Sequence, residues 1–107
     1  MKKGYKTELE VKKILSKNFS PENIFKIAIG GSLDFCVIGK NGQILKMVEV
    51  KTTKKKKWYP TKREINQFLR LLRLQKKLKI QIEYWIKIKR SWHIFSLEDL
   101  KKVIIKN

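Results

Sequence analysis

The chain has one cysteine, one histidine and no long apolar segment, and each of these features excludes a class of protein. The single Cys36 cannot form an intramolecular disulfide, and one Cys with one His cannot build a Cys/His zinc site. No apolar run approaches the roughly 18 residues of a membrane helix, and the N-terminus lacks the apolar segment of a signal peptide. We therefore expect a soluble, cytoplasmic protein that contacts no membrane.

Acidic residues are also scarce, with 9 against 27 basic residues and a net charge of +18. A small domain with so much charge of one sign repels itself and usually binds a polyanion. The hydrophobic fraction of 42% indicates a folded domain rather than a disordered polycation. Only 4 of the basic residues are arginine, the residue that base reading favours. The expected partner is nucleic acid, recognised through its backbone and shape.

The 107 residues are expected to form a single domain, residues 1–107, of the α/β class. An Asn-Gly pair within 40–43 predicts a hairpin turn, and the pattern T-K-R-E at 61–64 predicts a capping box that opens a helix. Periodicity and turn residues predict a helix over 5–19, strands over 24–29, 33–38 and 44–51, a helix over 61–77, strands over 79–88 and 91–95, and a final helix from 96. The order α-β-β-β-α-β-β-α predicts a small mixed sheet flanked by helices.

Most of the nine carboxylates have a local structural explanation. Glu64, Glu98 and Asp99 lie in the first turns of predicted helices, where acid is favoured. Glu22 lies in a turn, and Glu10 is expected on the solvated side of the first helix. Glu83 is expected to be solvated on the polar face of strand 79–88.

Glu8 has no such local explanation, because it shares a helical face with the apolar residues Val11, Leu15 and Phe19. A carboxylate directed toward the packed side needs a partner, since burying it alone is costly. A metal, a metal-bound water or a lysine would serve. The alternative is that Glu8, at the helix start, extends past its neighbours into solvent.

Asp34 and Glu49 fall in predicted strands, where acidic residues are disfavoured. Glu49 and Lys51 are two apart, so both side chains project from one face of the strand. The hairpin makes their strand the neighbour of the strand that contains Asp34, and Glu8 would arrive from the packed helix. Clustered carboxylates suit Mg²⁺ or Mn²⁺, and a nearby lysine can orient a water or stabilise charge on a phosphate.

Four segments together resemble the PD-(D/E)xK nucleases, and more narrowly the archaeal-type Holliday junction resolvases. They are GYKTELEV at 4–11, GGSLDFCVIG at 30–39, VEVKTTK at 48–54 and WYPTKREINQF at 58–68. The resemblance implies a symmetric homodimer that cuts four-way DNA junctions with Mg²⁺. One departure is Leu33, which stands where the superfamily name has proline.

The resemblance also implies roles for single residues. Glu8 matches the helix glutamate, Asp34 and Glu49 match the metal-binding carboxylates, and Lys51 matches the catalytic lysine. The carbonyl of Val50 would be a further metal ligand. Ser32 matches a loop serine close to the scissile phosphate, although an ordinary turn serine is the alternative.

Basic and aromatic residues around these segments are candidates for DNA binding. They are Lys2, Lys3, Lys6, Lys26, Lys54, Lys55, Lys56, Lys57, Trp58, Tyr59 and Arg63. The lysine run could instead be a solvated surface, and the two aromatic residues could stack on bases or pack against the following helix. The apolar face of helix 61–77 is wider than one core stripe, which indicates either a homodimer interface or a buried helix.

The sequence therefore predicts a Mg²⁺-dependent, structure-selective DNA endonuclease that resolves Holliday junctions. In this prediction Glu8, Asp34 and Glu49 hold the metal, and Lys51 assists the attacking water. Two alternatives remain open. One is a nuclease for other branched or duplex DNA. The other is a non-catalytic nucleic-acid-binding protein in which the acidic residues only form salt bridges with the excess lysines.

Overall fold

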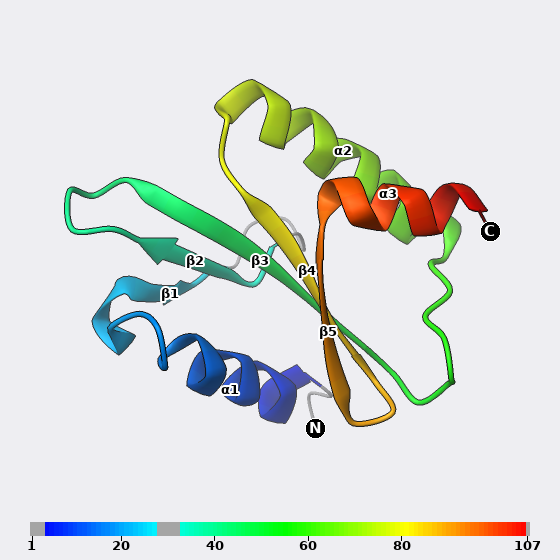
Figure 1. Cartoon of the computed structure of the whole chain (residues 1–107), viewed down its shortest axis with the longest axis horizontal. Helices are drawn as coiled ribbons and strands as arrows, with labels where there is room; N and C mark the ends of the chain where they lie inside the picture. Colours follow the sequence, from blue (N-terminus) through cyan, green and yellow to red (C-terminus); the bar gives the residue numbers. More distant parts are fainter. Residues whose placement is uncertain (1–3, 28–32, 107) are drawn as a thin grey trace.

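The computed structural model describes residues 4–27 and 33–106 of the chain (Figure 1). The predicted α/β class and element order are confirmed. The elements are α1 (Gly4–Leu15), the short 3-10 helix η1 (Pro21–Asn23), β1 (Ile24–Lys26), β2 (Phe35–Ile38), β3 (Ile44–Thr53), α2 (Lys62–Leu78), β4 (Ile82–Ile88), β5 (Ser91–Ser96) and α3 (Leu97–Lys106).

The five strands form one mixed sheet in the order β1-β2-β3-β4-β5. Strands β3 and β4 are parallel, and the other neighbouring pairs are antiparallel. The β2–β3 hairpin turns at Gly42, whose φ of +79° favours glycine, so the Asn-Gly prediction is confirmed. Because a parallel pair needs a crossover connection, α2 carries the chain from β3 back to the start of β4.

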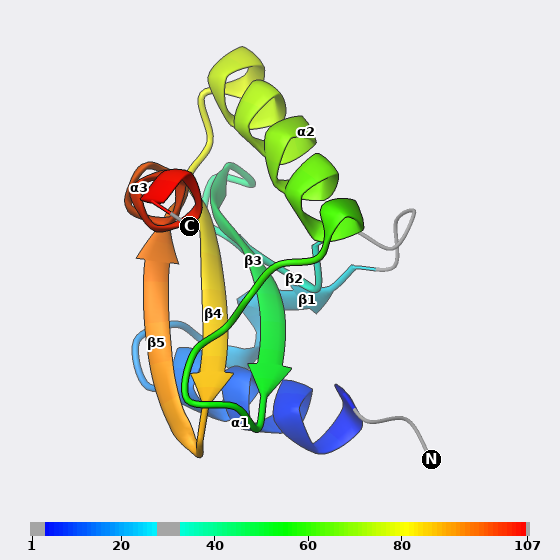
Figure 2. The same cartoon turned by 90° about the vertical axis from the view of Figure 1, so that its right-hand side faces the viewer.

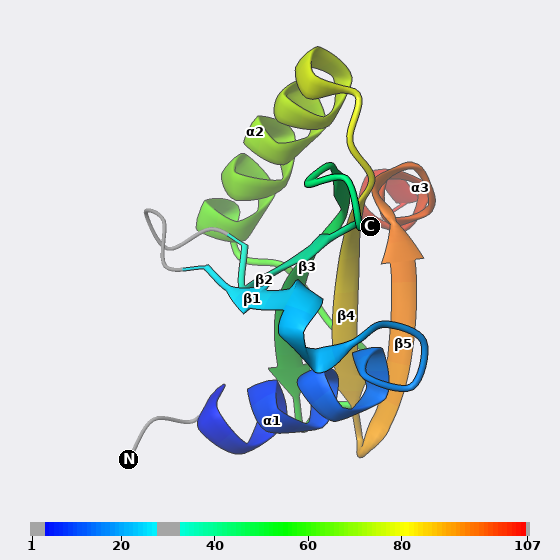
Figure 3. The same cartoon turned by 90° about the vertical axis from the view of Figure 1, so that its left-hand side faces the viewer.

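Helices cover both faces of the sheet. On one face, Val11 and Leu15 of α1 pack with Val48 and Trp85. On the other face, α2 and α3 pack on alternate residues of the same strands, namely Phe68, Leu71, Leu97 and Leu100 on Ile82, Tyr84 and Ile86. Figures 2 and 3 show opposite sides of the molecule, with α1 and the α2–α3 pair in separate layers. The side chains of Glu49 and Lys51 therefore start from the α2 face and not from the face that α1 covers.

Several element boundaries differ from the predicted ones for local reasons. Helix α1 ends at Leu15 rather than residue 19, because residues 16–18 form turns. Strand β1 ends at Lys26, and residues 28 and 29 of the predicted strand lie outside the described part. Leu33 has φ +66°, which delays the start of β2 to Phe35, and the left-handed Lys79 caps α2, which delays β4 to Ile82.

The hairpin between β4 and β5 turns through only two residues, Lys89 and Arg90, with φ values of +46° and +71°. Such turns favour Asn-Gly, because both central residues occupy the left-handed region. A side chain there costs about 1 kcal/mol per residue. The turn is tied to the end of β3, since the N–H of Lys89 donates to the carbonyl of Thr53 at 3.4 Å.

The prediction that Glu83 is solvated is wrong. Its strand is covered on both faces, and its side chain is only 12% exposed. The carboxylate forms an ion pair with Lys46 at 3.2 Å and accepts hydrogen bonds from Gln81 and from the indole of Trp85. The alternating sequence identified the strand, but the burial of its second face depends on α1.

Among the residues that the structure describes, no helix is both long enough and apolar enough to cross a membrane.

Candidate active site

Asp34 and Glu49 come together where β2 begins beside β3. The N–H of Asp34 donates to the carbonyl of Val48 at 2.8 Å, and its carboxylate accepts the N–H of Val50 at 2.7 Å. The N–H and C=O of one strand residue point to the same edge, so the Val50 carbonyl also faces this side. Strand β2 starts at Phe35 opposite Val48, which leaves this edge of β3 open beyond that pair. The predicted neighbourhood of Asp34, Glu49 and Val50 is thus present.

Glu49 is buried, with 3% of its surface exposed, and its carboxylate accepts the backbone N–H of Leu33. This bond explains the departure at position 33. Proline has no N–H to donate and holds φ near −65°, whereas Leu33 has φ +66°. At this position the chain therefore uses a residue that can take a left-handed conformation and hold the glutamate.

Lys51 lies between two carboxylates. Its ammonium nitrogen is 3.3 Å from Glu49 and 3.5 Å from Glu64. The other oxygen of Glu64 accepts the N–H of Thr61 at 2.9 Å in the capping box of α2, which confirms the predicted cap. Glu64 is a site residue that the sequence interpretation missed, because the cap alone accounted for it. Nothing in the spacing from Lys51 to Glu64 signals the contact.

Burial and mutual repulsion change the acidity of both carboxyls. Desolvation, and then the charge of Asp34, raise the pKa of Glu49 to about 7 despite the nearby Lys51. Desolvation, and then the charge of Glu8, also raise the pKa of Asp34. The site thus lacks positive charge, although the chain as a whole carries +18.

The donor atoms of this site suit a hard divalent cation. Asp34, Glu49 and the Val50 carbonyl offer oxygen, which Mg²⁺ prefers, and a cation would offset the charge that raises both pKa values. Within residues 4–27 and 33–106, no three His, Cys, Asp or Glu side chains are grouped so as to hold a metal on their own. Glu8, Asp34 and Glu49, which were predicted to hold the metal, are thus not brought together as a three-carboxylate group.

Glu8 approaches the site from α1, on the other side of the sheet. Its carboxylate is close enough to raise the pKa of Asp34, and it forms an ion pair with Lys26 of β1 at 2.7 Å. Of the partners considered for Glu8, lysine is therefore present. Glu10 is not simply solvated as predicted, because both of its oxygens lie 2.8 Å from the ammonium of Lys87.

The two aromatic candidates for base stacking are placed differently. Trp58 is 9% exposed, and its ring packs 6.2 Å from that of Tyr84, so it belongs to the core and is not free to stack on a base. Tyr59 is 58% exposed.

Tyr84 pairs with Glu49 across β3 and β4 and is fully buried. Its hydroxyl has no hydrogen-bond partner among the described residues, and burial raises the pKa of Tyr84. Tyr84, Trp58 and Phe68 form an apolar floor next to the buried glutamate.

The remaining candidates are basic residues and one serine. Lys2, Lys3 and Ser32 lie outside the described residues. Lys6, Lys26, Lys54, Lys55, Lys56, Lys57 and Arg63 are all exposed. Of these, Lys26 is engaged with Glu8, as described above.

No family model matches the chain, and no curated protein matches it significantly in sequence. Solved structures do resemble it. Hjc from Archaeoglobus fulgidus, described as a Holliday junction resolvase from an archaeal hyperthermophile, superposes with a TM-score of 0.54 and 17% identity over 86% of this chain and 74% of that chain. A protein named SSO0001 superposes with a TM-score of 0.48 and 16% identity over 97% of this chain and 59% of that chain. The resemblance seen in the sequence is thus confirmed at the level of the fold, which is that of an archaeal Holliday junction resolvase.

Proposed function

We propose that this protein is a Mg²⁺-dependent, structure-selective DNA endonuclease that resolves four-way junctions. The observation that carries the proposal is the Asp34–Glu49–Lys51 cluster, in which two carboxyls with raised pKa values meet an oriented lysine. The resolvase-like fold and the net charge of +18 support the same activity.

Asp34, Glu49 and the Val50 carbonyl would hold the metal, with Glu8 close by. When bound, Mg²⁺ polarises a phosphate oxygen and lowers the pKa of a water so that it can attack phosphorus. Lys51, fixed between Glu49 and Glu64, would donate hydrogen bonds to the attacking water or to the charged phosphate oxygens. The apolar floor of Tyr84 and Trp58 excludes bulk water from one side of this cluster.

DNA would be held through its phosphates by the exposed Lys54–Lys57 run and neighbouring cations. A homodimer would present two sites to two strands of a junction. The exposed Leu69 and Leu78 of α2 support such a dimer, since the rest of the apolar face of α2 packs in the core.

Asp34 also argues against the non-catalytic alternative. If the carboxylates only paired with excess lysines, Asp34 should form an ion pair. Among the described residues, no lysine or arginine lies within ion-pair distance of Asp34, and its carboxylate accepts a backbone N–H instead. A carboxyl kept partly buried and without an ion pair is typical of a site that awaits a cation.

The test is cleavage of a labelled four-way junction, a linear duplex and a flap, with and without Mg²⁺. We expect the wild type to cut the junction in Mg²⁺, and Asp34→Asn to cut it at least about 100-fold more slowly. Glu22→Gln, a matched change in the exposed turn before β1, should cut normally.

Each outcome separates the alternatives. Failure of the wild type to cut any substrate would refute the enzyme. Equal cutting of linear duplex would refute junction selectivity and leave the nuclease. Full activity of Asp34→Asn would place the site elsewhere.

A further inference from the structure

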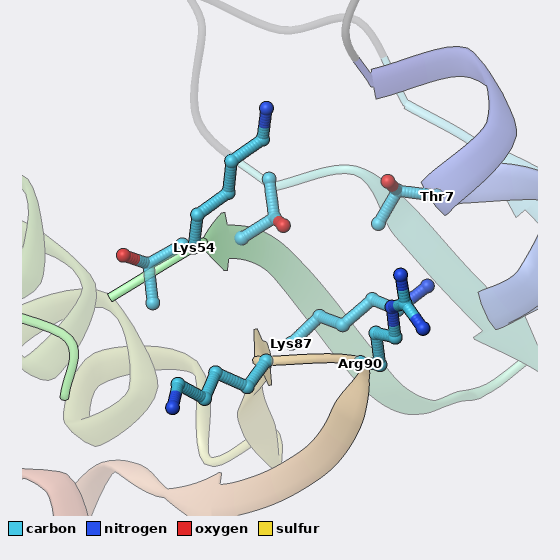
Figure 4. A pocket seen from close by; sticks show the side chains of 7 residues that line it. Thr7, Lys54, Lys87 and Arg90 are labelled. Carbon is cyan, nitrogen blue, oxygen red and sulfur yellow. The ribbon is translucent and has the colours of Figure 1, made fainter. Parts of the chain in front are cut away.

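A pocket of about 510 Å³ lies at the end of β3 (Figure 4). It is lined by Thr7, Thr52, Thr53, Lys54, Lys87, Lys89 and Arg90. Figure 4 shows these side chains arriving from α1, from the end of β3 and from the β4–β5 hairpin. Thr7 directly precedes Glu8, and Thr52 directly follows Lys51. Thr52 pairs with Lys87, which binds Glu10 of α1, so this part of the pocket lies on the α1 side of the sheet, next to Glu8. The side chain of Lys51 starts from the opposite side of the same strand.

All the charged side chains that line this pocket are positive. It contains four cations and three threonine hydroxyls, and no carboxylate is among its lining residues. Lys87 is neutralised by Glu10, at 2.8 Å from both oxygens. Within the described part of the chain, no acidic side chain lies within ion-pair distance of Lys54, Lys89 or Arg90. Cations and hydroxyl donors around one concave space are the chemistry that binds a phosphate group.

The backbone of the hairpin supports the same interpretation. Lys89 and Arg90 both have positive φ, where asparagine and glycine would be favoured, and the turn is fixed to Thr53 by a backbone hydrogen bond. Strained non-glycine residues cluster at functional sites, where the surrounding structure holds them. Here the two strained residues are cations that line the pocket.

We infer that this pocket binds a backbone phosphate of the DNA, one to two nucleotides from the phosphate that is cut. Thr53 lies two residues beyond Lys51, or about 7 Å along the strand. That distance is about one phosphate step along one DNA strand, because neighbouring phosphates lie about 7 Å apart through space and only about 3.4 Å apart along the helix axis. The inference rests on the proposed function for its substrate and adds a subsite that holds the strand next to the cluster of carboxylates.

The test is the double variant Lys89→Asn with Arg90→Gly. It gives the turn its favoured sequence, so it should fold at least as stably as the wild type, while it removes both unpaired cations. Binding to a labelled junction is measured without divalent metal over a range of salt concentrations. We expect the affinity at about 0.1 M salt to fall roughly tenfold or more, and the magnitude of the slope of log affinity against log salt to fall by about one, because one phosphate contact is lost.

The control is Lys101→Gln with Lys102→Gln. It removes the same charge from exposed positions on α3, at the other end of β5 from the hairpin. This control should bind with nearly the wild-type salt slope. An equal loss of junction affinity in the control and in the hairpin variant would show that the effect comes from net charge alone, and it would overturn the inference. If the double variant is unstable, Arg90→Gly alone carries the same comparison, with a change of slope in the same direction and of less than about one.

A junction with single uncharged methylphosphonate links locates the subsite. The wild type should lose affinity when a link one or two positions from the cut is neutralised, and the hairpin variant should be insensitive at that link. Equal sensitivity of both proteins at every link would overturn the inference. Binding and cleavage are measured separately. A protein that cuts nothing, but whose wild type loses affinity at one neutralised link where the hairpin variant does not, would refute the proposed nuclease alone. A hairpin variant that behaves as the wild type at every link would refute the pocket alone.

Discussion

The carboxylate site and the basic hairpin pocket both include residues of β3, and their charges are of opposite sign. The carboxylate site has an excess of negative charge, and the hairpin pocket has an excess of positive charge. In the first, buried Glu49 and half-buried Asp34 have too little positive charge around them, and both pKa values rise. In the second, Lys54, Lys89 and Arg90 are exposed. The first site thus favours a cation, and the second favours an anion. A metal ion at the carboxylates and a neighbouring DNA phosphate at the hairpin would balance the charge of both.

Glu49 offers the largest expected effect. Its pKa is about 7 in the folded protein against an ordinary 4.5, so between these values the folded state binds more protons than the unfolded state. The free energy of unfolding should therefore fall as the pH rises from about 4.5 to about 7, by on the order of 3 kcal/mol. Urea unfolding at pH 5 and pH 8 without divalent metal measures this change.

Two controls sharpen this prediction. Glu49→Gln should show a much smaller loss between the two pH values, because its amide still accepts the Leu33 N–H but cannot ionise. Mg²⁺ should restore stability at pH 8 in the wild type and not in Glu49→Gln. A wild-type stability that is constant over this range would show that Glu49 is not deprived of positive charge, and the comparison between the two sites would fail.

Glu8 and Glu10 provide a matched pair on one helix. Both form ion pairs, but Glu8 acts on Asp34 and Glu10 holds Lys87. We expect Glu8→Gln to slow junction cleavage on the order of 30-fold with junction binding unchanged, as for other residues that support a metal site. Glu10→Gln should change the cleavage rate by less than about threefold. Loss of binding or of folding in Glu8→Gln would assign this residue a structural role.

Glu64 should have the smallest effect. Glu64→Gln retains an oxygen for the Thr61 N–H, so the cap of α2 and the stability should be nearly preserved. Lys51 loses one of its two charged partners, and we expect cleavage about tenfold slower. In Lys51→Ala the same substitution should have no further effect on the rate. Full additivity of the two changes would show that Glu64 does not act through Lys51.

Short-range patterns in the sequence predicted much of the fold and the centre of the site. The Asn-Gly turn paired the strands of Asp34 and Glu49, and the two-residue spacing placed Lys51 beside Glu49. Features that depend on distant packing were not predictable. Glu83 is buried because α1 covers its face. The strand bounds placed a turn at residues 89 and 90, but the left-handed conformation of Lys89 and Arg90 was not indicated, because the turn lacks glycine and asparagine.

Glu64 also links the assembly of the site to the order of folding. One of its oxygens closes the first turn of α2, and the other contacts Lys51 from a strand that ends eight residues before that helix begins. A chain in which α2 has not yet formed would hold Lys51 through Glu49 alone. The position of the lysine is therefore complete only after the first turn of α2 has closed on Thr61.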